Sequence, residues 1–418
     1  MKEIFKKNKC RLCESKNLKP ALNLGYSPLA NSFSKYRKKN KKYPLKVLRC
    51  INCNHLQLSH VINEKKLFSE YLFVSGTSKT NLRHFKNYAN ECKKRFLSKK
   101  SKILDIASND GSFLKFFSYK NLKVGIDPAK NIVSNLKNPN FHTEKAFFNY
   151  NSSIKLKKKY GNFDLITANN VCAHVNDLRD FVLGIKNLLS KNGVFIFEVG
   201  YFHDVLLNKT FDTIYHEHLD YHLFTPLISF FKKYELEIFD VKNIFIQGGS
   251  IRVYVGHIRN HEINTKNLRN LIYKEKKMGY SNKTLFDKFQ KFIKKKREHL
   301  LTQLQSILEK NKKIAGYGAS AKSTTFLNYF KLDSKHLNFI ADLNIFKQNR
   351  YSPGSNIKIL HPKNIYQKKI DYILILSWNF SIEIIKQNIN FLKKGGKFII
   401  PFPRILILDK SNYKKYLK

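Results

Sequence analysis

The sequence of 418 residues contains no apolar run that approaches the roughly 20 residues a membrane-spanning helix requires. Its first ten residues, MKEIFKKNKC, also lack the apolar core of a signal peptide. Hydrophobic residues make up 42% of the chain and aromatic residues 14%, which is ample for packed interiors. We therefore expect a soluble cytoplasmic protein, and the length favours two or three domains over a single core.

Acidic residues are scarce, since 30 Asp and Glu stand against 78 Lys and Arg, and the formal net charge is +48. Such an excess can indicate nucleic-acid binding, because Lys and Arg neutralise phosphates. Here the lysines are spread over the whole length together with many Asn, Ile, Tyr and Phe, a pattern that an AT-rich coding sequence would impose. Net charge bears on solubility and nonspecific binding rather than on fold. We expect no nucleic-acid partner, although a preference for an anionic ligand remains.

Cysteine is also rare, but four of the six cysteines form two C-x-x-C pairs, Cys10 with Cys13 and Cys50 with Cys53. Each pair can bring two thiolates to one ion, and two pairs complete a tetrahedral zinc site with no position left open for catalysis. Disulfides are disfavoured in a reducing cytoplasm, and redox chemistry needs a strand-to-helix setting that the flanks lack. The pattern predicts structural zinc. The loop between the pairs is longer than in common zinc ribbons, so we expect it to have a function of its own.

From about residue 70 the sequence alternates between helical and strand patterns. The stretch KILDIASNDGSFLKFF predicts a strand at 102–106, a turn of small residues, and a helix that begins near Gly111. A second strand ends at Asp127, a third is expected at 164–168, and a hairpin with a Gly-Gly turn closes the series. This order predicts an α/β fold with the Rossmann-like core of a class I methyltransferase.

The turn after the first strand lacks the three spaced glycines that approach a pyrophosphate in dinucleotide-binding folds. Asp105 ends the first strand, and Asp127 ends the second, where a carboxylate can accept hydrogen bonds from a ribose diol. These features favour S-adenosylmethionine over NAD. The predicted binding residues are Asp105, Ala107, Asn109, Gly111, Asp127 and Asn169.

The last part of the chain predicts a long amphipathic helix over 281–310, followed by a strand and a glycine-rich turn in KIAGYGAS that leads into a helix. A lone G-x-G is weak evidence for a dinucleotide, but the pattern indicates a second Rossmann-like domain. Lys322, near the start of that helix, can meet a diphosphate or can be one more solvated lysine. We expect a zinc-binding domain at 1–69, a methyltransferase domain at 70–258 and a C-terminal domain at 259–418.

Several motifs in this order resemble the sugar C-methyltransferases that act on nucleotide-activated keto-deoxysugars. They follow the four-cysteine segment and are SEYLFVSGTS, LDIASNDGSFL, GIDPAKN, YHEHLDYHLFT, GGSIRVYVG, GYGASAKSTTFLN and NRYSPGSNIKI. The resemblance covers nearly the whole chain, and its most specific parts are the YHEH run and the order of the three domains. Ala107 stands where the family's first glycine is familiar, and Phe73 puts in doubt any hydroxyl contact at its position.

The resemblance implies an enzyme that removes a proton from the carbon next to a ketone and transfers a methyl group to the enolate. It assigns His218 as the base and Glu217 as the residue that orients or charges it. Tyr215 and Tyr71 would line the sugar or donate to its carbonyl, and His174 would add a polar contact from the cofactor side. The implied partner is a nucleotide sugar held by the C-terminal domain, and we expect a monomer.

Other functions stay open at this stage. A small-molecule O- or N-methyltransferase would share the architecture, because sequence does not name the acceptor atom. An RNA or DNA methyltransferase would explain the zinc and the charge, but it predicts basic residues clustered with aromatic ones. A scaffold that has lost activity is a further alternative, as is a structural role for YHEH as a polar hinge between helix and strand. His216 and His222 are expected to be structural.

Overall fold

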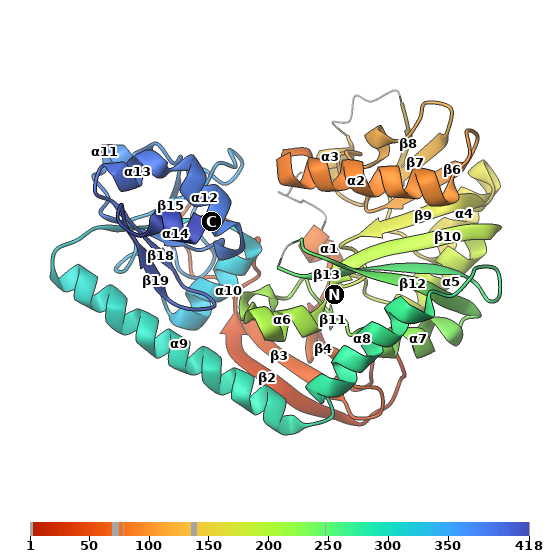
Figure 1. The fold of residues 1–418 in the computed structure, drawn as a ribbon, viewed down its shortest axis with the longest axis horizontal. Coiled ribbons are helices and arrows are strands. Elements are labelled where there is room, and N and C mark those ends of the chain that lie inside the picture. The colour runs from red at the N-terminus through yellow and green to blue at the C-terminus, as the bar shows by residue number, and fades with distance from the viewer. Residues whose placement is uncertain (1–2, 69–74, 78, 135–139, 247, 418) are drawn as a thin grey trace.

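The computed structural model describes residues 3–68, 75–77, 79–134, 140–246 and 248–417. The three larger of its four β-sheets organise three parts of the chain, and the two larger parts stand side by side above the N-terminal sheet (Figure 1). No helix in the described ranges combines the length and hydropathy needed to cross a bilayer.

The N-terminal sheet has the strand order β11-β4-β3-β2, and β1 pairs separately with β5. Apolar residues alternate along β3, which buries one face of the sheet. Strand β11 comes from the YHEHLDY region and pairs antiparallel with β4, so this sheet includes a strand from the middle of the chain. The elements are β1 (Ile4–Lys6), β2 (Leu18–Ser27), β3 (Tyr43–Cys50), β4 (Leu56–Leu58), β5 (His60–Ile62), α1 (Glu64–Phe68) and β11 (Asp220–Tyr221).

The central sheet has the order β12-β13-β10-β9-β6-β7-β8, in which only β13 runs antiparallel to its neighbours. This is the strand arrangement of a class I methyltransferase, and the predicted fold class is confirmed. The strand predicted at 102–106 is present with the same ends, and the one predicted at 164–168 is one residue longer at each end. The strands are β6 (Lys102–Ile106), β7 (Leu122–Ile126), β8 (His142–Glu144), β9 (Phe163–Asn169), β10 (Leu189–Gly200), β12 (Leu236–Ile244) and β13 (Ser250–His257).

The helix predicted near Gly111 is not present, and that prediction is wrong. A single 3-10 turn, η2 (Leu114–Phe116), stands there instead, and Phe113, Leu114 and Phe117 are buried in and around it. The other helical elements around the central sheet are η1 (Ser75–Thr77), α2 (Lys79–Phe96), η2 (Leu114–Phe116), α3 (Lys130–Val133), α4 (Tyr150–Tyr160), α5 (Leu178–Leu188), α6 (Phe202–Asn208), η3 (Phe211–Thr213) and α7 (Phe224–Lys232).

The C-terminal sheet has the order β16-β15-β14-β17-β18-β19 and is parallel except for β19. The chain moves outward from β14 to β16 and returns at β17, so the carboxyl ends of β14 and β17 form the topological switch point where such folds bind ligands. The strands are β14 (Ile314–Tyr317), β15 (Ile340–Ala341), β16 (Ile359–Leu360), β17 (Tyr372–Ile375), β18 (Lys397–Ile400) and β19 (Leu406–Leu408).

The predicted long helix is α9, which runs along the lower edge of the molecule and packs against β2 (Figure 1). It therefore joins the C-terminal part to the N-terminal sheet. Helix α8 (Thr265–Met278) packs against β12 and α7 of the central part. The helical elements of the C-terminal part are α9 (Lys283–Glu309), α10 (Ala321–Phe330), α11 (Asn364–Gln367), η4 (Trp378–Phe380), α12 (Ser381–Gln387), α13 (Ile389–Lys393) and α14 (Tyr413–Leu417).

Candidate active site

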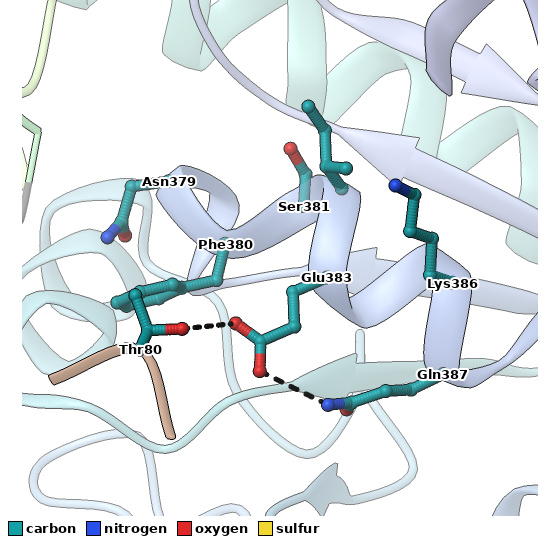
Figure 2. Close-up of a pocket in the computed structure, with 8 residues that line it drawn as sticks. Thr80, Asn379, Phe380, Ser381, Glu383, Lys386 and Gln387 are labelled. Atoms are coloured by element: carbon teal, nitrogen blue, oxygen red, sulfur yellow. Dashed lines mark hydrogen bonds between the residues drawn. The ribbon is translucent and has the colours of Figure 1, made fainter. Parts of the chain in front are cut away.

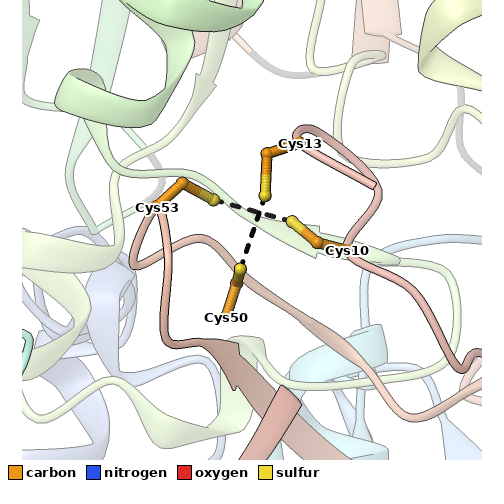
Figure 3. A group of neighbouring side chains, drawn as sticks. All are labelled: Cys10, Cys13, Cys50 and Cys53. Atoms are coloured by element: carbon orange, nitrogen blue, oxygen red, sulfur yellow. Dashed lines mark hydrogen bonds between the residues drawn. The ribbon is translucent and has the colours of Figure 1, made fainter. Parts of the chain in front are cut away.

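The four paired cysteines converge on one point (Figure 3). The sulfur atoms of Cys10 and Cys53 are 3.6 Å apart, those of Cys13 and Cys50 are 3.5 Å apart, and all four lie within 4.8 Å of one another. Four thiolates around zinc at ~2.3 Å give sulfur separations of about 3.8 Å. The cluster therefore fits a tetrahedral zinc ion, as the spacing predicts.

The two cysteine turns share one backbone geometry. In each, the backbone N–H four residues after the first cysteine donates to that cysteine's carbonyl oxygen, Glu14 N to Cys10 O at 3.0 Å and Asn54 N to Cys50 O at 2.9 Å. Glu14 and Asn54 both have a φ of 61°, a left-handed conformation that reverses the chain after the second cysteine. The equivalent geometry aims both thiols of each turn at the same centre.

The turn after β6 also needs left-handed backbone, at Ala107, Asn109 and Gly111. A Cβ atom on Gly111 would lie 2.0 Å from the Phe141 ring, so only glycine fits there. Ala107 takes a conformation that costs an L-residue about 1–2 kcal/mol, which explains why glycine is the familiar residue at this place.

Asp127, directly after β7, closes this turn. Its two carboxylate oxygens accept hydrogen bonds from the backbone N–H of Asn109 at 2.9 Å and of Ala129 at 2.8 Å. Burial raises the pKa of Asp127, and these two donors partly offset that effect. Among the described residues, Ser108 Oγ and Asn169 Oδ1 are buried without a hydrogen-bond partner at the ends of β6 and β9. Such orphaned polar atoms at the carboxyl ends of these strands fit a polar ligand such as S-adenosylmethionine.

Asp105 is buried near the carboxyl end of β6 and contacts β9. It is 3% exposed, and Thr167 Oγ1 on β9 donates a 2.6 Å hydrogen bond to it. Burial raises the pKa of Asp105 to about 7, the Thr167 bond opposes the shift, and Asp127 adds to it. Asn169 Nδ2 also approaches Asp105 at 3.5 Å. Asp105 therefore links β6 to β9 through hydrogen bonds.

The YHEH run forms a turn in which His218 N bonds to Tyr215 O at 3.0 Å. This turn brings the Tyr215 hydroxyl 2.7 Å from His218 Nε2, while His218 Nδ1 lies 2.8 Å from the carbonyl oxygen of Thr213. The surrounding protein lowers the pKa of His218 well below its ordinary value, first by burial and then through the nearby His174. The ring is therefore neutral at pH 7, and its Tyr215 partner is in place.

His174 approaches the same point from the loop after β9. Its Nδ1 atom donates to the backbone oxygen of Glu217 at 2.7 Å, and the ring centres of His174 and His218 are 4.9 Å apart. Burial lowers the pKa of His174 to about 4. The structure thus brings together three predicted residues, His174, Tyr215 and His218, from two distant segments.

The expected contact between Glu217 and His218 is not present, and Thr213 orients the ring instead. Adjacent residues in this turn point apart, so the Glu217 carboxylate faces Asn31, whose Nδ2 lies 2.8 and 2.9 Å from its two oxygens. Burial raises the pKa of Glu217 to about 7, with Asn31 and Lys347 opposing the shift. Asn31 belongs to the loop between the cysteine pairs, which therefore reaches the site.

His216 and His222 have separate surroundings. His216 Nε2 lies 3.3 Å from Pro44 O, and His222 Nε2 lies 3.3 Å from Cys172 O. Both rings face the protein interior, in keeping with a structural role. Tyr71 and Phe73 lie outside the described residues.

Helix α10 brings the C-terminal part to the same site. Thr324 Oγ1 donates to Ala30 O at 2.8 Å, and Thr325 Oγ1 donates to Ile214 O at 2.9 Å, immediately before YHEH. In the first turn of this helix, burial lowers the pKa of Lys322 and the nearby Asp212 raises it. Trp378 Nε1 donates to Asp212 at 2.9 Å. Sequence reasoning missed Asp212, whose only signal was its place beside YHEH.

A cavity of about 600 Å³ lies between the start of α2 and α12. Figure 2 shows Thr80 facing Glu383, with a 3.4 Å hydrogen bond across the opening. Helix α12 follows the carboxyl end of β17, so the cavity adjoins the switch point of the C-terminal sheet. It therefore lies between the methyltransferase core and the C-terminal part.

Three family models match consecutive stretches of the chain. They describe a candidate zinc binding domain at residues 10–68, a methyltransferase domain at 81–239 and a C-methyltransferase C-terminal domain at 245–403. The chain is also 28% identical over 408 residues to the C-methyltransferase NovU of Streptomyces niveus, with 96% of this chain and 97% of NovU covered. The chain is thus similar to C-methyltransferases along nearly its whole length. It is an S-adenosylmethionine-dependent methyltransferase with a zinc-binding N-terminal domain.

Solved structures of methyltransferases resemble the middle of the chain. One is an S-adenosylmethionine-dependent methyltransferase from Clostridium acetobutylicum, at 15% identity and a TM-score of 0.33, covering 42% of this chain and 92% of that one. Another is the plantazolicin methyltransferase BpumL in complex with a substrate analogue and SAH, at 13% identity and a TM-score of 0.36, covering 44% of this chain and 86% of that one.

Proposed function

We propose that this methyltransferase methylates the ring carbon next to the ketone of a nucleotide-activated keto-deoxysugar. The observation that carries the proposal is the Tyr215–His218 pair, in which an uncharged histidine faces a phenol hydroxyl at 2.7 Å. Carbon is a poor nucleophile until a proton has been removed, so C-methylation needs a base held in place beforehand. Oxygen and nitrogen acceptors have lone pairs and need such a base less.

The proton reaches His218 through Tyr215. A carbonyl oxygen only accepts, so the bond to Thr213 fixes the neutral His218 ring with its proton on Nδ1 and its lone pair on Nε2. Tyr215 gives its hydroxyl proton to Nε2 while its oxygen takes the proton from the sugar carbon. The imidazolium formed on His218 keeps its hydrogen bond to Thr213, and His174 and Glu217 maintain the shape of the turn.

Bound S-adenosylmethionine supplies the electrophilic methyl group. We propose that Asp127 accepts from its ribose diol and that Ala107, Asn109, Gly111 and Asn169 form the walls of its site, with Asp105 supporting them from behind. The orphaned Asn169 Oδ1 and the closed turn around Asp127 support this assignment.

The nucleotide part of the substrate is proposed to bind at the carboxyl ends of β14 and β17. Lys322 lies in the first turn of α10, whose Ser320 Oγ accepts from Ser323 N at 3.2 Å as an N-cap. A lysine beside a helix N-terminus favours a diphosphate through both its charge and the helix dipole. The cavity beside α12 offers room next to this switch point.

The test is to incubate the purified protein with S-adenosylmethionine labelled with carbon-13 in the methyl group and a thymidine-diphosphate 4-keto-6-deoxysugar. We expect a product with one added methyl group and a carbon-bound methyl signal in the NMR spectrum. An oxygen-bound methyl signal would contradict C-methylation of the sugar, and no product with any keto-deoxysugar nucleotide would contradict the substrate class.

A further inference from the structure

Asp220, two residues after His218, is hydrogen-bonded by one side chain from each cysteine turn. Arg11, which lies between Cys10 and Cys13, donates from Nε to Asp220 Oδ1 at 2.8 Å. His55, two residues after Cys53, lies with Nε2 2.9 Å from the same oxygen. The side chains of Arg11 and Asp220 are 6% and 0% exposed, so this is a buried and hydrogen-bonded ion pair rather than a solvated surface pair.

The same guanidinium group also binds the loop after β9. Arg11 Nη1 donates to Asn176 O at 3.0 Å, and Nη2 donates to Val175 O. In addition, the backbone N–H of Arg11 donates to Gln57 Oε1 at 2.8 Å, and Gln57 is the residue of β4 that pairs with Asp220. One arginine therefore joins the cysteine turn, the β4–β11 pair and the loop after β9.

The two segments that Arg11 joins to each other are the ones that carry the reactive histidines. Leu219, the residue after His218, donates from its backbone N–H to the carbonyl oxygen of Ala173, the residue before His174, at 2.7 Å. The hydrogen bond from His174 to Glu217 O is a second link between the two segments. A shift of either segment would therefore change the distance between the two histidine rings.

We propose that Arg11 is a positioning residue that couples the metal site to the Tyr215–His218 pair. Zinc bound by Cys10 and Cys13 fixes the backbone of Arg11 from both sides, and Arg11 then holds Asp220 and the loop after β9. This inference rests on the proposed function only for the role of His218. A misplacement of about 1 Å at a reacting group can cost on the order of 10²-fold in rate.

The plain alternative is that Arg11 only helps the domains to dock. In that case Arg11→Lys, which keeps the charge and loses the fork, would lower stability without changing the reaction of the folded molecules. Arg179→Lys is the matched control, because Arg179 is exposed just beyond the same loop. Asp220→Asn is the second variant. It removes the same ion pair by changing the other partner, and it serves as the test if Arg11→Lys does not fold.

The first measurement is hydrogen–deuterium exchange of the full-length zinc-loaded protein, followed by mass spectrometry. In Arg11→Lys, in Asp220→Asn and in wild type treated with a zinc chelator, we expect at least tenfold faster exchange in peptides spanning 172–176 and 217–221. Peptides spanning 103–106 and 122–129 should keep wild-type rates, and the affinity for S-adenosylmethionine should stay within twofold. Wild-type exchange at 172–176 and 217–221 in all three samples would overturn the proposal.

The second measurement separates positioning from docking. In Arg11→Ala we expect kcat for methyl transfer to fall on the order of 10²-fold while KM for S-adenosylmethionine is unchanged. Guanidinium chloride at low millimolar concentration should restore part of the lost kcat in Arg11→Ala and none in His218→Ala. A wild-type kcat in Arg11→Ala would overturn the proposal. Altered exchange in a protein that methylates no sugar nucleotide would support the coupling and contradict only the proposed substrate.

Discussion

His218 donates a hydrogen bond from Nδ1 to the carbonyl oxygen of Thr213, 2.8 Å away. Because the carbonyl cannot donate, this bond selects the tautomer whose free lone pair, on Nε2, meets the Tyr215 hydroxyl. The lowered pKa of His218, caused first by burial, keeps the ring neutral at physiological pH. A neutral base with a defined tautomer is what removal of a weakly acidic carbon proton requires.

His218→Ala should abolish exchange of the proton next to the sugar ketone with deuterated water, and methyl transfer with it. Loss of a general base costs on the order of 10²- to 10⁴-fold in rate. Tyr215→Phe should lose exchange to a similar extent, because the proton passes through its hydroxyl. Both variants should bind S-adenosylmethionine normally, as measured by calorimetry.

The exposed His299 on α9 provides a control, since His299→Ala should exchange and methylate as wild type does. If His218→Ala methylated at a near-normal rate, the YHEH run would be a structural turn. If Tyr215→Phe alone kept its exchange rate, His218 would take the proton directly.

Asp127→Ala should weaken the binding of S-adenosylmethionine at least tenfold. The carboxylate both closes the donor turn through Asn109 and Ala129 and is the proposed acceptor for the ribose diol. NAD should show no binding, because the turn has no cradle for a pyrophosphate. Calorimetry with each ligand measures both expectations. Asp287→Ala, at an exposed position on α9, is the control, and unchanged affinity in Asp127→Ala would refute the donor site.

The pKa of Glu217 predicts a loss of stability as the pH rises from about 5 to 7. Burial raises this pKa to about 7, above the ordinary value of 4.5. Between these two values the unfolded chain is ionised while the folded protein holds the proton, so the free energy of unfolding falls as pH rises. Glu217→Gln keeps an acceptor for Asn31 and removes the titration. Relative to wild type, its free energy of unfolding should rise from pH 5 to pH 8 by on the order of 1–3 kcal/mol.

Urea unfolding at both pH values measures this difference. The exposed Glu262 provides the control, because Glu262→Gln should show no pH-dependent difference from wild type. A difference between Glu217→Gln and wild type that stays constant from pH 5 to pH 8 would show that Glu217 is ionised throughout.

Local patterns explain what the sequence could predict. The strand at 102–106 is a run of buried apolar residues that ends in a polar turn, so its type and its place in the sheet follow from nearby residues alone. The four cysteines carry a spacing that zinc dictates. The helix near Gly111 was wrongly predicted because the spacing of Phe113, Leu114 and Phe117 fits an α-helix as well as the buried 3-10 turn that the structure has.

Contacts between distant segments explain what the sequence could not predict. Glu217 and Asn31 are 186 residues apart, and Asp220 and Arg11 are 209 residues apart. No periodicity links residues at such separations. The orientation of Glu217 away from His218 also depends on the turn at Tyr215, whereas an extended strand would have placed alternate residues on one face.

The purified protein should contain one zinc ion per chain, since four thiolates saturate tetrahedral zinc. Cys50→Ala combined with Cys53→Ala leaves two ligands on one turn, so metal analysis by mass spectrometry should find less than a tenth of the wild-type zinc. Cys92→Ala is the control, because Cys92 is buried in the core away from the cluster and its loss should lower stability while zinc stays bound. Chelation of zinc from wild type should lower the melting temperature, because the two cysteine turns then lose the ion that joins them. Full zinc occupancy in the double variant, or a folded native protein purified without zinc, would contradict the assignment of these four cysteines.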